Sequence, residues 1–546
     1  MLKFLFLRNK RKYIFFLCSL LTILLFLFLN SSCQRQGKVK NFILITLDTQ
    51  RADYISAYDS SHASTPNIDS LAQQGTLYEN CFSLIPITLP SHASIFLSEP
   101  PYALKVYNNG QPLSQKRAKF SLTNIFKKHG YLTAAFVSLG VLKSDFGLAN
   151  GFDLYQDEFP RGRWYLDAGE INKEVFPWLE KNKDQRFFAW IHYSDPHEPY
   201  SPPDMPVDLK ISLNGKPVGK FCLSKYTINE ITLTLDKGQN QIEFEVNNPD
   251  SISPENFQAR LDRLDFYPLT EEKALDIQLA DGWSSRKKQE IYLLKKQGFI
   301  NITNHSQSCE IKISFRGKLM IPLERLRELY KKEVEYLDSQ LGRLWNKLKE
   351  LGLFETSHIL IVGDHGEGLG DFLNKNGSHH IGHIHYLYNV YLRVPLIIYN
   401  PQAKTKGVRV SEAVSLIDIA PTIIDIMGFK RPSSYRGRNL TVLNKKENTA
   451  IFEETYAPEA KKDRFAILHL PWHLIFTPDE GRYELFNLKK DAQEKKNIFK
   501  KNNLSPSLKR LKRQLDSYVR QILKSKKEVK IDKRTEEMLR ALGYIK

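Results

Sequence analysis

The sequence predicts an α/β protein whose mostly parallel sheet is covered by helices on both faces. Three apolar runs of strand length, at 42–47, 187–193 and 359–363, are separated by stretches with helical periodicity. Continuous apolar runs are typical of strands buried on both faces. Alternation of such strands with helices is typical of a parallel sheet. At 546 residues the chain is long enough for one such core with additions.

The first half of the core follows this alternation from the strand at 42–47. Proline in the first turn, a closing glycine and apolar spacing mark the helices. The expected elements are helices from 65, at 121–129 and at 171–181, and strands at 132–138 and 187–193. The stretch 85–94 lies between them, and we expect its hydroxyl residue Thr88 to lie in a loop beside Pro90, with Ser91 able to begin a helix.

From about 205 to 317 the pattern changes to alternating apolar and polar residues. The runs 231–235 and 241–246 alternate in this way, with the turn residues Asp236-Lys237-Gly238 between them. Such patterning is typical of an antiparallel β-sandwich. We expect an inserted all-β domain here, the alternative being an enlarged loop region. Cys222 and Cys309 flank this segment and could form a disulfide.

The second half returns to the α/β pattern. Leucines on one stripe of 324–351 predict a long helix packed on the core and stopped by Gly352. The remaining elements expected are strands at 359–363 and 394–399, a helix at 417–426, a small antiparallel C-terminal sheet with strands at 465–468 and 473–476, and a basic surface helix at 505–528.

The net charge of +18 could favour nucleic acid, an anionic membrane surface or an anionic substrate. No zinc-finger spacing, RNA-binding signature or basic-helix pattern accompanies this charge, so we expect no nucleic-acid partner. The cationic residues gather in the leader and in the last third of the chain. A membrane-surface role and simple solvation both agree with that distribution.

The first 33 residues resemble an export leader. Five basic residues precede an apolar run from 13 to 29, and Cys33 follows small residues, as in a loose lipoprotein cleavage site. Cleavage would make Cys33 the lipidated N-terminus; without cleavage the run would be a membrane anchor. Either case predicts a membrane-anchored protein on the periplasmic or extracytoplasmic face, with a short tether at 34–40.

Acidic residues and histidines follow the predicted strands. Asp48 ends the first strand, Asp364-His365 ends the strand at 359–363, and Asp195 and His197 follow the strand at 187–193. Ligands in open α/β sheets bind outside the carboxyl ends of the strands. Two carboxylates and an imidazole suit Zn²⁺ or Mn²⁺ better than Ca²⁺. A hydroxyl beside such an ion loses its proton more readily and becomes a nucleophile.

Each of these residues has a structural alternative. A single acidic residue at a strand end is often a helix cap or a turn residue, and a single histidine is often a buried structural residue.

Taken together, several stretches resemble the sulfatase family of the alkaline phosphatase superfamily. The matching stretches are 45–53, 86–94, 130–131, 151–153, 195–200, 363–370, 393–396, 418–422 and 542–544. They recur in order over about 45–200 and 320–546. The resemblance implies an alkaline phosphatase/sulfatase-like fold and a metal-dependent ester hydrolase or transferase.

The chain departs from the family at the nucleophile. Sulfatases carry Cys or Ser in C-x-P-S-R, which is converted to formylglycine, whereas here Thr88 and His92 take the first and last places. The pattern is closer to the branch that uses an unmodified threonine, such as envelope phosphoglycerol and phosphoethanolamine transferases. That resemblance implies a divalent ion (Zn, Mn or Ca) held by Asp48, Thr88, Asp364 and His365. Thr49, where sulfatases usually place a second Asp, argues for fewer ligands.

The resemblance also implies residues around the nucleophile. His92, Asn109 and His197 are expected to hold developing negative charge, and His197 and His383 to bind or protonate the substrate. Because 376–388 contains His379, His380, His383 and His385, the choice of His383 stays open here.

These observations lead to one functional hypothesis and two alternatives. The first is a hydrolase or transferase acting on phosphate or sulfate esters of a glycan or lipid headgroup. The alternatives are a sulfatase proper and a catalytically decayed envelope glycan-binding protein. The expected domains are the leader at 1–33, the tether at 34–40, a catalytic core at 41–204 and 318–440, the insert at 205–317 and a C-terminal subdomain at 441–546.

Overall fold

The computed structural model describes residues 39–525 and residues 535, 536 and 539. Within that range it leaves out 161–162, 199, 201–207, 223–228, 248–257, 269–274, 282, 286–290, 294–296, 306–308, 321–322, 375–376, 443–448 and 457–461. The leader, Cys33 and most of the tether lie outside the described residues. Within the described part, no helix combines the length and the hydrophobicity needed to cross a bilayer.

A nine-stranded sheet forms the centre of the molecule, with the order β19-β2-β20-β16-β1-β5-β3-β4 and β21 beside β2. β1 (Asn41–Leu47) runs parallel to both β16 (Ser357–Gly363) and β5 (Phe187–Tyr193). The other strands are β2 (Thr76–Phe82), β3 (Leu132–Phe136), β4 (Leu154–Gln156), β19 (Arg393–Val394), β20 (Leu396–Tyr399) and β21 (Val408–Ser415). β19 and β20 are antiparallel to their neighbours. The predicted mostly parallel sheet is confirmed.

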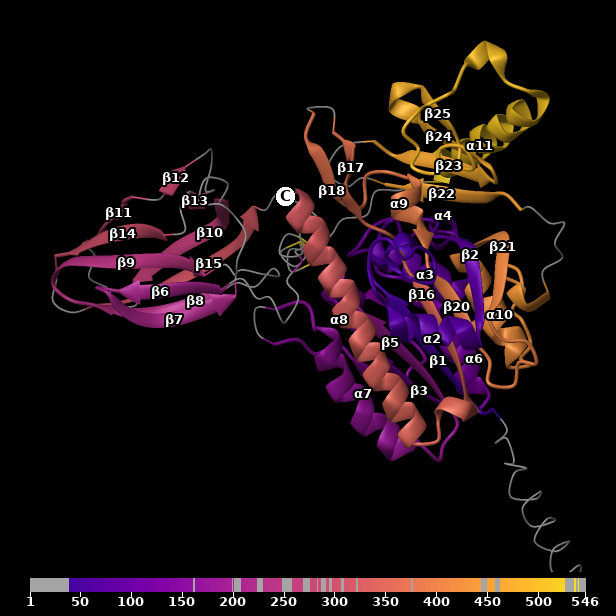
Figure 1. Ribbon diagram of the computed structural model, residues 1–546, viewed down its shortest axis with the longest axis horizontal. Coiled ribbons are helices and arrows are strands. Elements are labelled where there is room, and N and C mark those ends of the chain that lie inside the picture. The colour runs from indigo at the N-terminus through magenta and orange to yellow at the C-terminus, as the bar shows by residue number, and fades with distance from the viewer. Residues whose placement is uncertain are drawn as a thin grey trace, which may run out of the picture.

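Helices cover both faces of this sheet. Successive side chains of a strand point to opposite faces, and in the central strands both sets are apolar. Phe42 and Leu44 belong to one buried cluster and Ile43 and Ile45 to the other. The first cluster includes α3 (Thr88–Leu97), α6 (Leu122–Lys128) and α10 (Ile419–Ile426); the second includes α2 (Pro66–Gln74), α7 (Ala168–Asn182) and α8 (Leu323–Glu350). Figure 1 shows α7 and α8 side by side along the sheet.

The segment expected to present Thr88 in a loop is instead the first turn of a helix. α3 begins at Thr88, three residues earlier than the start that Ser91 indicated. Pro90 is accommodated because the first turn of a helix has no internal acceptors for its N–H groups. Thr88 therefore has a fixed position at a helix N-terminus.

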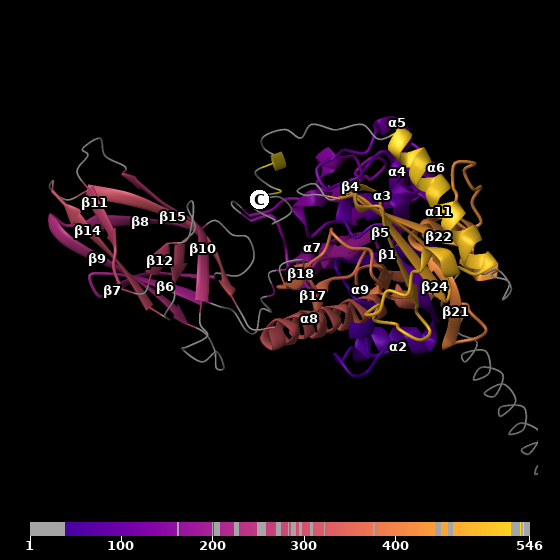
Figure 2. The ribbon, with the colours of Figure 1, turned by 90° about the horizontal axis from the view of Figure 1, so that it is seen from above.

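The segment between β5 and α8 forms two antiparallel sheets of five strands each, as expected for an all-β insert. One contains β12 (Trp283–Ser285), β13 (Ile291–Leu293), β10 (Gln258–Pro268), β15 (Cys309–Met320) and β8 (Asn229–Leu235). The other contains β11 (Leu275–Leu279), β14 (Gln297–Asn304), β9 (Gly238–Asn247), β6 (Asp208–Leu213) and β7 (Lys216–Cys222). A separate apolar cluster lies between them, and Figure 2 shows them as a lobe apart from the large sheet. Cys309 is a free buried thiol, so the suggested disulfide with Cys222 is wrong.

The C-terminal part forms the expected small antiparallel sheet. Its strands are β22 (Ile451–Thr455), β23 (Arg464–His469), β24 (Trp472–Thr477) and β25 (Arg482–Asn487). α11 (Pro506–Ser525) packs its apolar side against the first cluster of the core, where Leu515 and Ile522 are fully buried. Near this sheet lie the hairpin β17 (Gly368–Leu373) and β18 (His379–Gly382) and the short helices α4 (Pro101–Leu104) and α9 (Asn389–Leu392).

Candidate active site

Asp48 and Asp364 lie side by side because their strands are in parallel register. Leu47 of β1 pairs with Gly363 of β16, so the next residue of each strand is an acid at the same edge of the sheet. Both carboxylates and the adjacent His365 are fully buried. One ligand atom from each of the three lies within 4.8 Å of the others. Residues 316 positions apart in the chain are thereby brought into one cluster by strand pairing alone.

α3 brings Thr88 to this cluster. The Oγ1 atom of Thr88 lies 3.4 Å from Nε2 of His365. The Ser91 hydroxyl donates to the backbone carbonyl of Asp364 at 2.7 Å, which ties the first turn of α3 to the end of β16. A helix N-terminus directed at the cluster favours negative charge there.

The two carboxylates each have one engaged oxygen and one that has no hydrogen-bond partner among the described residues. Oδ1 of Asp364 accepts from the backbone N–H groups of Thr49 (3.1 Å) and His365 (2.7 Å), and Oδ2 of Asp48 accepts from Nε2 of His192 (3.3 Å). Oδ1 of Asp48 and Oδ2 of Asp364 have no such partner within the described chain. Buried carboxylate oxygens of this kind fit a divalent cation.

The pKa shifts of Asp48 and Asp364 also fit a bound cation. Burial raises the pKa of Asp48, but the hydrogen bond from His192 and the nearby His197 and His365 outweigh burial and hold that pKa well below its ordinary value. Burial and the charge of Asp48 raise the pKa of Asp364. Burial and the proximity of His383 lower the pKa of His365, which favours the neutral imidazole that binds metals. Two adjacent buried carboxylates are both ionised only when a positive charge compensates them.

The ring of His92 contacts the backbone of Thr88 on one side and the side chain of Thr46 on the other. Its Nδ1 contacts the Thr88 carbonyl oxygen at 2.8 Å, and its Nε2 contacts Oγ1 of Thr46 at 3.0 Å. Because the Thr88 carbonyl oxygen can only accept, Nδ1 carries the proton of the neutral ring and Nε2 accepts from the Thr46 hydroxyl. The indole N–H of Trp190 donates to the same Thr46 oxygen at 2.9 Å. These partners assign the neutral Nδ1–H tautomer, and burial together with His192 lowers the pKa of His92 to about 3. Both ring nitrogens are therefore engaged with this chain.

Asn109 reaches the start of α3 from the following loop. Its Oδ1 accepts from the backbone N–H of Leu89 at 2.9 Å, which satisfies one of the free donors of the helix N-terminus. Its Nδ2 is buried and has no hydrogen-bond partner among the described residues. The amide donor is thus held close to Thr88 by the acceptor half of the same side chain.

His197 and His383 lie beside the cluster. Their ring centroids are 5.2 Å apart, and the ring of His383 is 4.5 Å from that of His365. Nδ1 of His383 lies 3.3 Å from Oε1 of Glu367. Burial lowers the pKa of His197, whereas at His383 the carboxylate of Glu367 outweighs burial and raises the pKa.

The other histidines of the 376–388 segment face elsewhere. Nδ1 of His379 contacts the carbonyl oxygen of Gly370, and Nδ1 of His380 contacts the Tyr391 hydroxyl. The ring of His385 lies against His380, with centroids 5.8 Å apart. Of these four histidines, His383 is the one whose ring contacts the cluster residues.

Two residues near the cluster were missed from sequence. His192 bridges Ser138 and Asp48, with Nδ1 2.8 Å from the Ser138 hydroxyl. Glu367 is fully buried behind His383. The signal for Glu367 was its place three residues after Asp364; His192 lay inside an apolar strand, and only the register of β5 with β1 reveals it. Asp195 is not one of the clustered residues; its Oδ1 accepts from the N–H of Ala168 at the start of α7.

Comparison with known proteins identifies the family. A model of the sulfatase family matches residues 40–429. The chain belongs to the sulfatase family. A second model, described as the C-terminal part of N-sulphoglucosamine sulphohydrolase, matches residues 377–521. Sulfatase-family proteins are ester hydrolases of the alkaline phosphatase superfamily and use a divalent metal ion, which agrees with the carboxylate and histidine cluster.

Individual relatives of this sulfatase-family chain are distant but extend over most of its length. It is 23% identical over 531 residues to an N-acetylglucosamine-6-O-sulfatase of Bacteroides thetaiotaomicron, covering 89% of this chain and 88% of that protein. A protein solved with its substrate D-glucosamine-2-N,6-O-disulfate superposes with a TM-score of 0.59 at 18% identity, over 90% of this chain and all of that one. A phosphonate monoester hydrolase from Silicibacter pomeroyi gives a TM-score of 0.55 at 16% identity, over 89% and 96% of the two chains. The structural matches show the shared fold.

Proposed function

We propose that this sulfatase-family protein is a metal-dependent hydrolase or transferase that uses Thr88 as its nucleophile on a phosphate or sulfate ester. The observation that carries the proposal is the position of the Thr88 hydroxyl, 3.4 Å from His365 at the buried carboxylate pair. The resemblance to threonine-dependent envelope transferases supports the same assignment.

Asp48, Thr88, Asp364 and His365 would hold the ion, and the free oxygens of the two acids support this set. A bound Zn²⁺, Mn²⁺ or Ca²⁺ would supply the positive charge that eases loss of the Thr88 proton. His365 contributes a neutral imidazole, and His192 fixes the orientation of Asp48 through its hydrogen bond.

The reaction of the chain's own residues has two stages. Thr88 gives its proton to water, its oxygen forms a bond to phosphorus or sulfur, and the bond from that atom to the leaving oxygen breaks. His383, whose pKa is raised by Glu367, is placed to protonate that oxygen, and His197, whose pKa is lowered by burial, is suited to bind the substrate. The now neutral His383 then takes a proton from water or an acceptor alcohol, whose oxygen attacks the covalent Thr88 ester, and the Thr88 oxygen that is released takes a proton from water.

The polar residues around Thr88 receive separate roles. Asn109 Nδ2 would hold developing negative charge, together with His197. For His92 the contacts favour a positioning role in place of the charge-stabilising role expected from sequence, because both of its nitrogens are engaged with Thr88 and Thr46.

The leader supports a location for the protein, and the separate apolar cluster of the insert supports a division of the chain into domains. The basic and apolar leader supports a membrane-anchored protein on the extracytoplasmic side. The separate apolar cluster of the two small sheets supports an inserted domain at 205–317 between core segments 41–204 and 318–440, with a C-terminal subdomain at 441–546. A polysaccharide or lipid headgroup bearing the ester would be accessible at that location.

The relatives favour one further candidate, hydrolysis of sulfate esters. One relative is named as an N-acetylglucosamine-6-O-sulfatase, and one matched structure holds a glucosamine disulfate. Thr88 separates the two candidates, because a threonine cannot form the formylglycine that the sulfatase resemblance implies.

The deciding experiment measures turnover of bis-p-nitrophenyl phosphate, p-nitrophenyl phosphate and p-nitrophenyl sulfate by wild type, Thr88→Ala and Thr88→Ser, with metal content determined on each sample. We expect phosphodiester turnover to fall by about 10³-fold or more in Thr88→Ala and to survive in part in Thr88→Ser. Thr123→Ala is the matched control, since Thr123 is also buried but its hydroxyl has no hydrogen-bond partner in the described chain.

Other outcomes are informative. Sulfate ester turnover that survives Thr88→Ala would mean that Thr88 is not the nucleophile. Absence of turnover on all three substrates, with no metal in the wild-type protein, would favour a decayed glycan-binding protein.

A further inference from the structure

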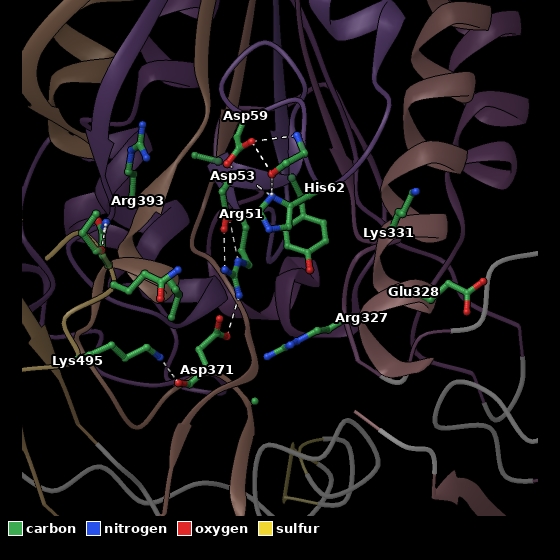
Figure 3. Close-up of a pocket in the computed structure, with 18 residues that line it drawn as sticks. Arg51, Asp53, Asp59, His62, Arg327, Glu328, Lys331, Asp371, Arg393 and Lys495 are labelled. Atoms are coloured by element: carbon green, nitrogen blue, oxygen red, sulfur yellow. Dashed lines mark hydrogen bonds and ion pairs between the residues drawn. The ribbon is translucent and has the colours of Figure 1, made fainter. Parts of the chain in front are cut away.

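A second cavity lies apart from the candidate active site. It has a volume of about 690 Å³, within the range of pockets that hold small organic ligands. Its walls come from the turn η1 (Ala52–Tyr54), the first part of α8, β17, the α9 region and the loop near Lys495. None of the proposed metal ligands is among its lining residues. Figure 3 shows the charged side chains that surround it.

The acidic side chains of this cavity are already paired. Asp53 and Asp371 both bind Arg51, with shortest N–O distances of 2.7 and 2.8 Å. Asp59 accepts from the Ser61 hydroxyl and backbone N–H. Glu328 pairs with Arg325 and is directed away from the cavity in Figure 3. Arg51 offsets only one of the two carboxylates that it binds, and the contacts of Asp59 with Ser61 leave the charge of that carboxylate in place.

Three of the basic side chains, by contrast, donate hydrogen bonds to backbone carbonyl oxygens. Nε of Arg327 donates to Leu369, Nε and Nη2 of Arg393 to Glu79, and Nζ of Lys495 to Asp371. Lys331 lies 3.7 Å from Glu335 on its own helix, a long contact for an ion pair. Arg327 reaches from α8 toward Arg51 and Asp371 in Figure 3. The lining residues include five Lys or Arg side chains and four carboxylates, so the cavity carries an excess of one positive charge.

We infer that this cavity is a second anion-binding site that takes a sulfate or phosphate group. Arg327 of α8 and Lys495 both reach toward Asp371 (Figure 3), and guanidinium and ammonium groups are suited to the oxygens of such a group. The volume leaves room for the organic part that carries the ester. Thr88 chemistry is not required for this binding, so the inference stands or falls independently of the proposed function.

One lining residue of the cavity, Arg51, contacts a residue beside the candidate active site. Nη1 of Arg51 donates to the carbonyl oxygen of Glu367 at 3.3 Å, and the carboxylate of Glu367 contacts His383. A polymer bearing repeated anionic esters could occupy this site with one group while another lies elsewhere on the protein. A free inorganic anion would satisfy the same cations without a polymer.

Calorimetric titration distinguishes an ester group carried by a polymer from a free inorganic anion. The full chain with Thr88→Ala, which prevents turnover, is titrated with sodium sulfate, sodium phosphate, dextran sulfate and neutral dextran. Arg327→Gln, Lys331→Gln and Lys495→Gln are added singly. Arg343→Gln is the matched control, because Arg343 is exposed on the same helix outside the cavity.

We expect Arg327→Gln and Lys331→Gln to raise the Kd for dextran sulfate by about fivefold or more, and Arg343→Gln to change it by less than twofold. An equal weakening of sulfate or phosphate binding would assign the site to the free anion, and an effect on dextran sulfate alone would assign it to a polymer-borne group. Neutral dextran should not bind.

Three results would overturn the inference. One is unchanged binding of every anion in all three cavity variants. Another is weakening by Arg343→Gln as large as that by Arg327→Gln, which would indicate a general charge effect. Because Arg327 also holds the β17 hairpin, a loss confined to Arg327→Gln with a lowered Tm would be structural, and unchanged binding in Lys331→Gln and Lys495→Gln would then reject the site.

Discussion

At the scale of single residues, the Thr46 hydroxyl joins the sheet to the helix that carries Thr88. It accepts from Trp190 and donates to His92, and His92 in turn contacts the Thr88 carbonyl oxygen. All of these side chains are fully buried, so water cannot replace a lost partner. The position of Thr88 therefore depends on a hydroxyl group that touches neither the proposed metal ligands nor the substrate.

Thr46→Val should lower the free energy of unfolding by about 2 to 4 kcal/mol, because it leaves a buried indole N–H and an imidazole nitrogen unpaired. It should also lower kcat, since His92 loses its anchor. Urea denaturation and the ester assay measure the two effects.

The matched control for this change is Thr123→Val, which removes a buried hydroxyl without a partner in the described chain. It should be neutral or slightly stabilising. A Thr46→Val protein as stable as Thr123→Val would show that the hydrogen bonds to Thr46 contribute nothing.

At the scale of elements, acidic residues at strand ends have two different uses. Asp48 and Asp364 meet because their parallel strands are adjacent, whereas Asp195 caps the first turn of α7. In the same way, Asp338 of α8 accepts from the backbone N–H groups of Asn67 and Ile68 at the start of α2. Capping by residues distant in sequence ties neighbouring helices together.

Many of the helices and strands could be predicted from the sequence. Periodicity predicted the long helix at 324–351, which is α8 at Leu323–Glu350, and β5 matched its predicted range. The start of α3 was not accessible, because Thr-Leu-Pro-Ser carries turn signals and the helix is held by contacts of Ser91 and Asn109 with distant residues. The role of Asp195 was also undecided, since a cap and a metal ligand look alike at a strand end. The domain boundaries at 204 and 317 stay predictions.

A buried glutamate at the junction of α4, β22 and α11 predicts a pH dependence of stability. Glu454 accepts from the N–H of Tyr102 at 2.8 Å and from the hydroxyls of Tyr456 and Tyr518 at 2.6 and 3.4 Å. Burial outweighs these hydrogen bonds and raises the pKa of Glu454 to about 7 from an ordinary 4.5. Its contribution to stability is therefore complete below pH 4.5 and is lost as the pH rises through 7.

Glu454→Gln removes this titration. The free energy of unfolding of the variant relative to wild type should rise between pH 4.5 and pH 8, by up to about 3 kcal/mol. Urea denaturation across this range tests it, with Glu355→Gln at an exposed carboxylate as control. A difference that is constant with pH would contradict the assignment.

At the scale of the whole molecule, the proposed metal links the two halves of the sheet. Asp48 and Asp364 are fully buried neighbours at the end of adjacent central strands, and burial and mutual repulsion raise the pKa of Asp364. A cation that binds the folded chain and not the unfolded one stabilises the fold by mass action.

Removal of metal by chelation should therefore lower the Tm by several degrees, since an ion at about 100 times its Kd contributes about 2.7 kcal/mol. Adding Zn²⁺, Mn²⁺ or Ca²⁺ separately should restore the Tm and identify the preferred ion. Asp364→Asn should lose most of this dependence. A Tm unaffected by chelation or by any of the three ions would argue against a metal at these carboxylates.

The pairing of β1 with β16 also has a consequence for the order of events during synthesis. The Thr49 amide and the Asp364 carboxylate, partners in one hydrogen bond, are 315 residues apart. At ribosomal rates of about 5–20 residues per second, roughly 15–60 s separate their appearance. During that interval Asp48 lacks the second carboxylate of the proposed site, which makes it a weak ligand for any cation. A metal at these carboxylates would therefore bind only after Asp364 has been synthesised and β16 has paired with β1.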